Sequence, residues 1–158
     1  MPYSALFMSG KILERAQEEG EGISNMKLQK LLYIANGIYL VKHGTPLIEE
    51  PIKAWKYGPV VEKVYYEFKK YGNESIKEIP WEYQQYKSKV KLDEDAEEAV
   101  TFVLEVAKKL SAIQLSNWTH AENSPWTKAK LQKDSLISEN DMKIFFEQFF
   151  NPELQNAE

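Results

Sequence analysis

The residue types that carry metal and hydrolytic chemistry are few in this chain and poorly spaced. It has no cysteine, and neither of its two histidines, His43 and His120, has a second ligand three or four residues away. Glu122, beside His120, is the sole candidate partner. The chain has no Gly-x-Ser-x-Gly elbow and no glycine-rich phosphate loop. Glu49 and Glu50 are adjacent, so in an extended segment their carboxylates point to opposite faces. We therefore predict a protein that is not an enzyme and uses no metal or cofactor.

A second group of residues has the chemistry of a protein-binding surface, because aromatic side chains and a few charged anchors dominate the energy of protein interfaces. We predict that a partner binds at Lys30, Tyr33, Trp55, Lys56, Tyr57, Tyr66, His120 and Trp126, together with the segments 73–91 and 118–126. A structural interpretation stays open for the same residues. Aromatic residues at strand or helix spacing suit a core, and a lysine on an apolar face can extend its ammonium to water. His120 can orient its loop through both ring nitrogens.

A helix is expected over residues 25–43, where it would position Lys30 and Tyr33. Ser24 can cap its start and Gly44 can end it. Apolar residues run nearly all the way round this helix, a pattern typical of a central, buried helix. Lys30 lies about 40° from Ile34 on the helical wheel, within an apolar face. Its ammonium must therefore reach water or find an acceptor.

An extended run over 52–57 carries Trp55, Lys56 and Tyr57, and Lys53 would share a face with Trp55 and Tyr57. We predict that Gly58-Pro59 opens the next helix, with proline at the first helical position, and that Gly72 ends it. The structural motif of this region would be Gly58, Pro59, Val60 and Tyr65.

Three ordered segments resemble one known family. The runs LQKLLYIANGIYL at 28–40, AWKYGPVVEKVYYEFKKYG at 54–72 and LSNWTHAENSPW at 115–126 are similar to the Panacea domain of SocA-like antitoxins and GepA phage-associated proteins. The resemblance implies a mainly α domain that acts as the antitoxin of a two-gene toxin–antitoxin pair. In that family the domain is paired with chemically unrelated toxins. At least one member is an adaptor that hands its toxin to a cytosolic AAA+ protease.

Capping signals predict further helices on both sides of this region. They begin at Ser4, Asp93, Ser111, Ser124-Pro125 and Ser138-x-x-Asp141, whereas 73–91 is expected to be a long irregular connection. The predicted fold is mainly α: one compact domain over 1–158, with about six helices, a short extended segment near 52–57 and a flexible tail at 153–158.

Composition and charge exclude several classes of protein. No apolar run approaches the roughly eighteen residues that span a bilayer, and the first residues lack the pattern of a signal peptide. We therefore expect a cytoplasmic protein with no membrane partner. Residues 1–75 hold ten basic and nine acidic residues (+1), and residues 76–158 hold ten and fifteen (−5), which gives the net charge of −4. This balance, with a single arginine, argues against a nucleic-acid-binding protein.

The sequence therefore predicts an antitoxin that neutralises its cognate toxin by direct protein–protein binding. Two alternatives stay open. A protease adaptor would deliver the toxin to an AAA+ protease, so that neutralisation would require the host unfoldase. A nucleic-acid-binding regulator of its own operon would show an affinity for DNA that falls steeply with salt. The sequence does not define an oligomeric state.

Overall fold

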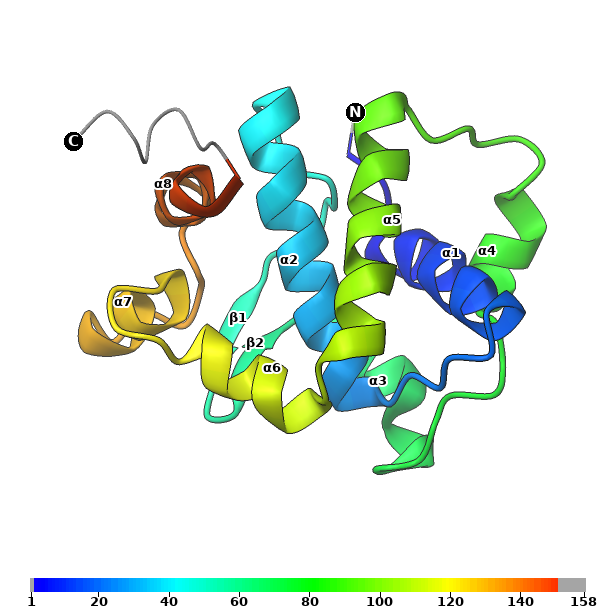
Figure 1. Cartoon of the computed structure of the whole chain (residues 1–158), viewed down its shortest axis with the longest axis horizontal. Helices are drawn as coiled ribbons and strands as arrows, with labels where there is room; N and C mark the ends of the chain where they lie inside the picture. The colour runs from blue at the N-terminus through cyan, green and yellow to red at the C-terminus, as the bar shows by residue number, and fades with distance from the viewer. Residues whose placement is uncertain (1, 151–158) are drawn as a thin grey trace.

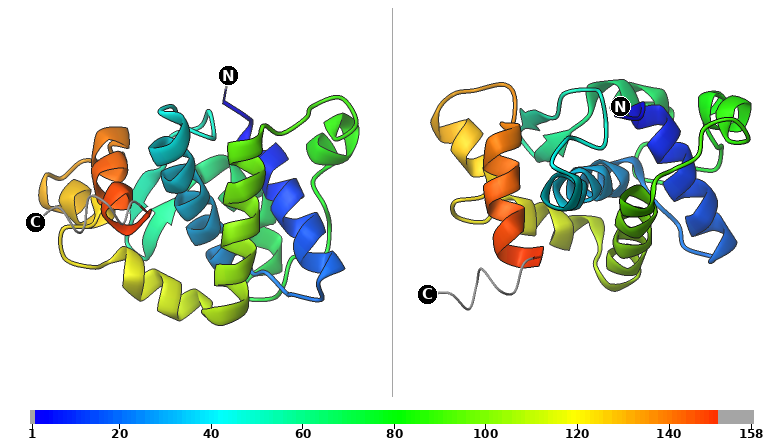
Figure 2. Two further views of the ribbon diagram at one scale, coloured as in Figure 1. Left: turned by 45° about the horizontal axis from the view of Figure 1, so that its top comes forward. Right: turned by 90° about the horizontal axis from the view of Figure 1, so that it is seen from above.

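The central element of the fold is helix α2 (Asn25–His43), which contacts α5, α8, α6, α1, α3 and strand β2. Figure 1 shows α2 crossing the middle of the molecule, and the right-hand view of Figure 2 looks nearly along it. In that view the hairpin lies on one side of α2 and α5 and α6 lie on the other. The structure is a computed structural model that describes residues 2–150, so the tail predicted at 153–158 lies outside the described residues.

The described chain has eight α-helices, one 3₁₀ helix and one hairpin, in agreement with the predicted mainly α fold. The predicted count of about six helices was slightly low. In chain order the elements are α1 (Ala5–Glu18), α2 (Asn25–His43), β1 (Lys53–Trp55), β2 (Gly58–Val60), α3 (Glu62–Phe68), η1 (Lys69–Tyr71), α4 (Trp81–Tyr86), α5 (Glu94–Lys109), α6 (Ala112–Thr119), α7 (Pro125–Leu131) and α8 (Glu139–Phe150).

Capping side chains set the helix boundaries as predicted. Ser24 Oγ accepts a hydrogen bond from the Lys27 amide, and Gly44 ends α2 in a left-handed conformation with φ 87°. The predicted caps of the other helices are also present. The side chains of Ser4, Asp93, Ser111, Ser124 and Ser138 each accept a backbone N–H from the first turn of the helix that follows.

The prediction that Gly58-Pro59 opens a helix was wrong. These residues form strand β2, which pairs antiparallel with β1 and places Ala54 opposite Pro59. Gly58 has φ 126°, and the Val61 amide donates to Gln29 Oε1 at 2.8 Å, so the chain stays extended until α3 begins at Glu62. Tyr57 lies in the turn of this hairpin and does not share a strand face with Lys53 and Trp55.

The connection at 73–91 contains a helix that the sequence did not predict. In α4, Tyr83 is buried and packs on Gly10 of α1, where a Cβ would lie only 2.1 Å from the Tyr83 Cβ. The Tyr83 hydroxyl donates to Glu14 Oε1 at 2.8 Å. Trp81 at the start of α4 is 71% exposed, so its side chain lies on the surface and not over the core.

A second close approach seats α8 on α2. A Cβ at Gly37 would lie 2.3 Å from the Phe146 ring, so the helices can pack this closely only because position 37 has no side chain. Asn36 beside it accepts the backbone amides of Leu47 and Ile48 and so holds the chain that leads to the hairpin. Within residues 2–150, no helix combines the length and the apolar character needed to cross a bilayer.

Candidate functional site

A cavity of about 520 Å³ lies between the start of α2, the hairpin and α3. We call it the Lys30 cavity. It is lined by Asn25, Met26, Gln29, Lys30, Trp55, Lys56, Tyr57, Val60, Tyr65, Lys69, Gly72 and Asn73. Its size is in the range of ligand-binding pockets, which cover about 300–1,000 Å³. The lining contains three lysines, and none of the described lining residues is acidic, in a chain whose net charge is −4.

The hairpin turn closes over the end of the Lys30 side chain. A Cβ at Gly58 would lie 2.7 Å from Lys30 Cε and 3.0 Å from Lys30 Nζ, and it would also approach the Thr119 hydroxyl at 3.1 Å. Gly58 therefore meets two requirements of the site. Its φ of 126° suits glycine, and the missing side chain leaves room for the lysine head.

Lys30 is only 2% exposed, and within residues 2–150 its ammonium makes no hydrogen bond or ion pair. Burial lowers the pKa of Lys30 to about 8. Lys27, one turn earlier on α2, is also buried, but its ammonium donates to the Ala107 carbonyl and lies 3.6 Å from Glu21. Of these two buried lysines on one helix, Lys27 thus has acceptors, whereas Lys30 has none within residues 2–150.

The polar wall of the Lys30 cavity is already hydrogen-bonded. Gln29 Nε2 donates to Asn25 Oδ1, and Asn25 Nδ2 donates to the Tyr65 carbonyl, each at 3.0 Å. The Gln29 carbonyl accepts the Val61 amide. These bonds fix the wall in place and use one N–H of each side-chain amide, whereas the buried Lys30 ammonium makes no hydrogen bond within residues 2–150.

Aromatic side chains surround the mouth of the cavity. Trp55 packs edge-on against Tyr65 and Tyr66, with ring centroids 5.0 and 6.3 Å apart. Tyr57 is 63% exposed and Tyr66 is 58% exposed. Lysine ammonium groups lie over both exposed rings. We call Trp55, Lys56, Tyr57, Tyr65, Tyr66 and Lys69 the aromatic–basic face.

The connection from α6 to α7 supports the hairpin turn from behind. Trp126 Nε1 donates to the Trp55 carbonyl at 2.6 Å, and Ser116 Oγ donates to the Tyr57 carbonyl at 2.8 Å. The His120 ring packs edge-on against Trp126, with centroids 3.9 Å apart. Burial and, to a smaller extent, the nearby Lys30 ammonium lower the pKa of His120, and a hydrogen bond with the Lys56 backbone only partly offsets this.

The structure thus brings most of the predicted binding residues to one place, but it gives them different positions. Lys30 is the floor of the cavity, and Trp55, Lys56 and Tyr57 also line it. Tyr66 lies beside the lining, packed against Trp55, and His120 and Trp126 are half-buried supports. Tyr33 is fully buried against Trp118 and Phe146, away from the surface.

Two buried polar atoms near the site, the Tyr33 hydroxyl and His120 Nε2, have no hydrogen-bond partner in the part of the chain described. Sequence reasoning missed Asn25, Gln29 and Lys69 as parts of the site. Asn25 and Gln29 lie four residues apart on a helix, which was a signal that they share a face.

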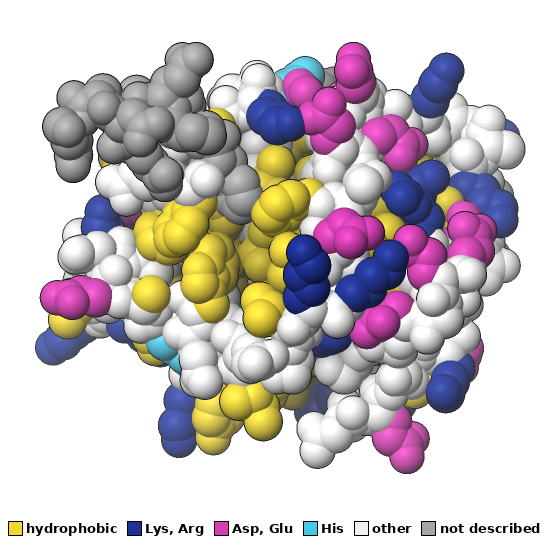
Figure 3. Space-filling model, in the orientation of Figure 1, with side chains coloured by type: hydrophobic (Ala, Val, Ile, Leu, Met, Phe, Trp, Pro, Cys, Tyr) yellow, Lys and Arg dark blue, Asp and Glu magenta, His cyan; other side chains and the backbone are white. Residues whose placement is uncertain are grey.

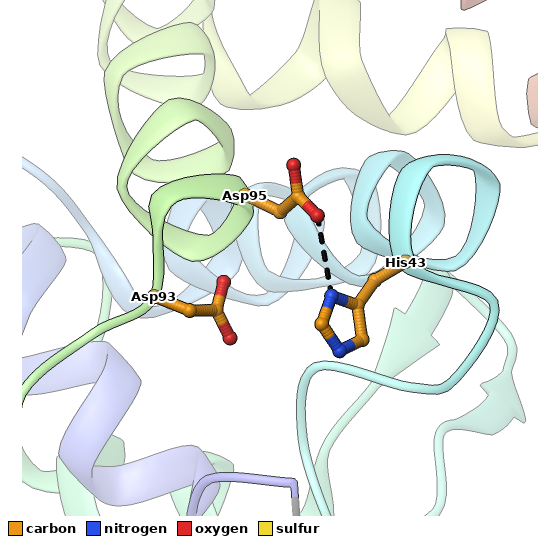
Figure 4. Close-up of side chains that lie close together, drawn as sticks. All are labelled: His43, Asp93 and Asp95. Carbon is orange, nitrogen blue, oxygen red and sulfur yellow. Dashed lines mark hydrogen bonds and ion pairs between the residues drawn. The ribbon is translucent and has the colours of Figure 1, made fainter.

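A group of three potential metal ligands lies at the opposite end of α2, and its spacing in the sequence gave no sign of it. Figure 4 shows His43 at the end of α2 beside Asp93 and Asp95 at the start of α5. His43 Nδ1 lies 3.2 Å from Asp95 Oδ2, and the ligand atoms lie within 4.8 Å of one another. Both Asp93 oxygens accept protein donors, from the Ala96 amide and the Tyr39 hydroxyl. The group therefore has a structural role in joining α2 to α5, and Glu122 is not the sole candidate partner for a histidine.

An apolar hollow marks another face of the molecule. Figure 3 shows hydrophobic side chains gathered at the centre of this view, with charged side chains beside them. The hollow has a volume of about 220 Å³ and is lined by Ile34, Phe102, Val106, Leu110, Leu115, Trp118 and Phe149. It contains no charged group to orient a ligand, unlike the Lys30 cavity.

The fold and the cavity together define a small helical binding domain, and comparison with known proteins identifies its family. The family described as antitoxin SocA-like, Panacea domain, matches residues 28–127. Antitoxin SocA of Caulobacter vibrioides (strain NA1000 / CB15N) is 37% identical over 120 residues. The chain therefore belongs to the SocA-like, Panacea-domain antitoxin family, which confirms the resemblance seen in the sequence.

The match to Antitoxin SocA covers 73% of this chain and 64% of that protein, so it spans less than two thirds of the relative's length. No solved structure matches this chain. The family match, residues 28–127, contains every residue of the aromatic–basic face and all the residues that line the Lys30 cavity except Asn25 and Met26.

Proposed function

We propose that this chain is an antitoxin that neutralises a toxin protein by binding it directly through the aromatic–basic face. One observation carries the proposal: the exposed Tyr57 lines a cavity whose floor is an unpaired, buried cation, and the exposed Tyr66 packs against the lining residues Trp55 and Tyr65. Aromatic residues around a desolvated polar anchor are typical of the energetic centre of a protein interface.

The name of the relative supports the same function. Antitoxin SocA is called an antitoxin, and the family that matches residues 28–127 carries the same description. In this proposal the partner is the toxin encoded beside the antitoxin, and neutralisation is stoichiometric, because a bound antitoxin covers the part of the toxin that acts on the cell. His120 and Trp126 support the hairpin turn and do not contact the partner.

The test is co-expression of this chain with the product of the adjacent gene, scored by growth rescue and by co-purification. We expect rescue and a stable complex for the wild type. Tyr57→Ala and Tyr66→Ala should each weaken binding by about 1–2 kcal/mol with little loss of stability, because both side chains are exposed. Ile144→Ala is the control, since Ile144 is an exposed apolar residue on α8, outside the aromatic–basic face and outside the segments 73–91 and 118–126.

Two results would contradict the proposal. In the first, both tyrosine variants bind as tightly as the wild type, and binding is lost when the acidic residues at the start of α5 are replaced. The interface would then lie at the other end of α2. In the second, growth is rescued only in cells that contain the AAA+ protease, and the toxin disappears from those cells. The chain would then act by delivering the toxin to the protease and not by binding alone.

A further inference from the structure

We infer that the Lys30 cavity receives an aspartate or glutamate side chain of the bound partner, whose carboxylate pairs with the Lys30 ammonium. This inference rests on the proposed function and names the chemistry of its anchor. It begins from the contrast on α2, where the buried Lys27 has two acceptors and Lys30, which is buried still more deeply, has none within residues 2–150.

The charge of the Lys30 cavity selects an anion. Lys56 and Lys69 stand with Lys30 among the lining residues, and no acidic residue is described there. Elsewhere in the described chain, carboxylates do accompany lysines, as in the pairs Lys53–Glu62 at 2.9 Å and Lys70–Glu78 at 3.2 Å.

The donor set favours a carboxylate over a phosphate. A phosphate group presents three strong acceptor oxygens and is usually held by several N–H groups. Here one N–H of each side-chain amide, of Asn25 and Gln29, is already bonded, and the Gln29 side-chain oxygen accepts the Val61 amide. Lys30 is the one buried cation among the described lining residues, because Lys56 and Lys69 are exposed, and one buried cation suits a single carboxylate.

The surroundings favour a protein side chain over a free small molecule. The walls are apolar and aromatic, with Val60, Trp55 and Tyr65, and suit the methylene stem of a glutamate or aspartate. Tyr57 and Tyr66 extend the contact area beyond the cavity, where a small ligand would not reach and a protein surface would. The carboxylate would thus be the buried anchor of a larger interface.

The first experiment measures binding of the adjacent gene's product to the whole chain by calorimetry. Lys30→Met should weaken binding about 30-fold or more, because it leaves the partner's carboxylate buried without a cation. Lys27→Met is the matched control, since Lys27 is also buried on α2 but its partners are internal, and its affinity should stay within about 3-fold of the wild type. If Lys30→Met binds as tightly as the wild type, the inference is wrong.

A second measurement keeps the inference separate from the proposed function. If the wild type does not bind the product of the adjacent gene, the proposed function fails, and titration with N-acetylglutamate methylamide then tests the cavity alone. The Lys30 Cε signal, assigned by its absence in Lys30→Met, should shift in NMR spectra with this probe. It should not shift with the matching glutamine compound at the same ionic strength. An equal shift with the glutamine compound or with inorganic phosphate, or no shift with the glutamate probe, would overturn the inference.

Discussion

Replacing Lys30 by methionine should make the free protein more stable, which is an unusual result for a buried residue. Burial lowers the pKa of Lys30 from 10.5 to about 8 in the folded state. Each pKa unit corresponds to about 1.4 kcal/mol, so at pH 7 the buried charge lowers the free energy of unfolding by about 3 kcal/mol. Methionine has a similar shape and no charge to bury. We therefore expect Lys30→Met to gain about 3 kcal/mol at pH 7.

The gain should disappear as the pH rises. Below pH 8 the lysine is charged in both the folded and the unfolded chain, so the full penalty is present. Between pH 8 and 10.5 the folded chain releases the proton while the unfolded chain still holds it, so the stability of the wild type rises with pH. The difference between Lys30→Met and the wild type should thus fall from about 3 kcal/mol towards zero over this range.

Urea denaturation at several pH values between 7 and 10.5 checks the prediction. The tyrosines also titrate in this range, but they do so in both proteins, so their effect cancels in the difference between the two free energies of unfolding. The control is Lys27→Met, which should lose about 1–3 kcal/mol at pH 7, because the Ala107 carbonyl and Glu21 lose their partner. A loss of stability in Lys30→Met, or a difference that does not change with pH, would refute the reasoning and would mean that Lys30 has an acceptor in solution.

Three further substitutions test the close contacts of the fold. Gly58→Ala should lower the free energy of unfolding by about 2 kcal/mol or more and weaken partner binding, because φ is 126° and the new Cβ would displace the head of Lys30. Gly37→Ala should cost about 2–4 kcal/mol by pushing Phe146 and α8 away from α2, which tryptic digestion of α8 would detect. Asp93→Ala removes the cap of α5 and should cost about 1–2 kcal/mol at pH 7. Burial raises the pKa of Asp93, but the hydrogen bonds that its carboxylate accepts, the strongest from Tyr39, lower the pKa overall. The cost of Asp93→Ala should therefore shrink as the pH falls below about 4 and the carboxylate is protonated.

Local signals in the sequence were enough to predict most helix boundaries. Ser24, Ser111 and Ser138 each precede a helix and bond to its first turn, and such bonds depend on residues three positions apart. The near-continuous apolar surface of α2 likewise predicted its central place. The error at Gly58-Pro59 has a long-range cause, since the Gln29 side chain, 32 residues away, binds the Val61 amide and keeps the chain extended.

The candidate site was predictable in its residue types and not in its geometry. The periodicity of α2 placed Lys30 on an apolar face and left open whether its ammonium reached water. That choice depends on Gly58, which lies against the lysine head from another element of the fold. Contacts between distant elements also decide the burial of Tyr33, whose neighbours Trp118 and Phe146 come from α6 and α8. They likewise bring His43 to Asp95, which the sequence spacing did not indicate.

The floor of the Lys30 cavity belongs to α2, the helix around which the whole domain packs, whereas its mouth belongs to a two-residue turn and the exposed side of α3. Substitutions of Lys56 and Tyr57 in the turn and of Tyr66 on α3 would disturb little of the core, because these side chains are exposed. A scaffold divided in this way can keep one fixed anchor and exchange the residues around it. It could therefore acquire new partners by surface substitutions alone, provided that each partner brings an acidic residue to the same position.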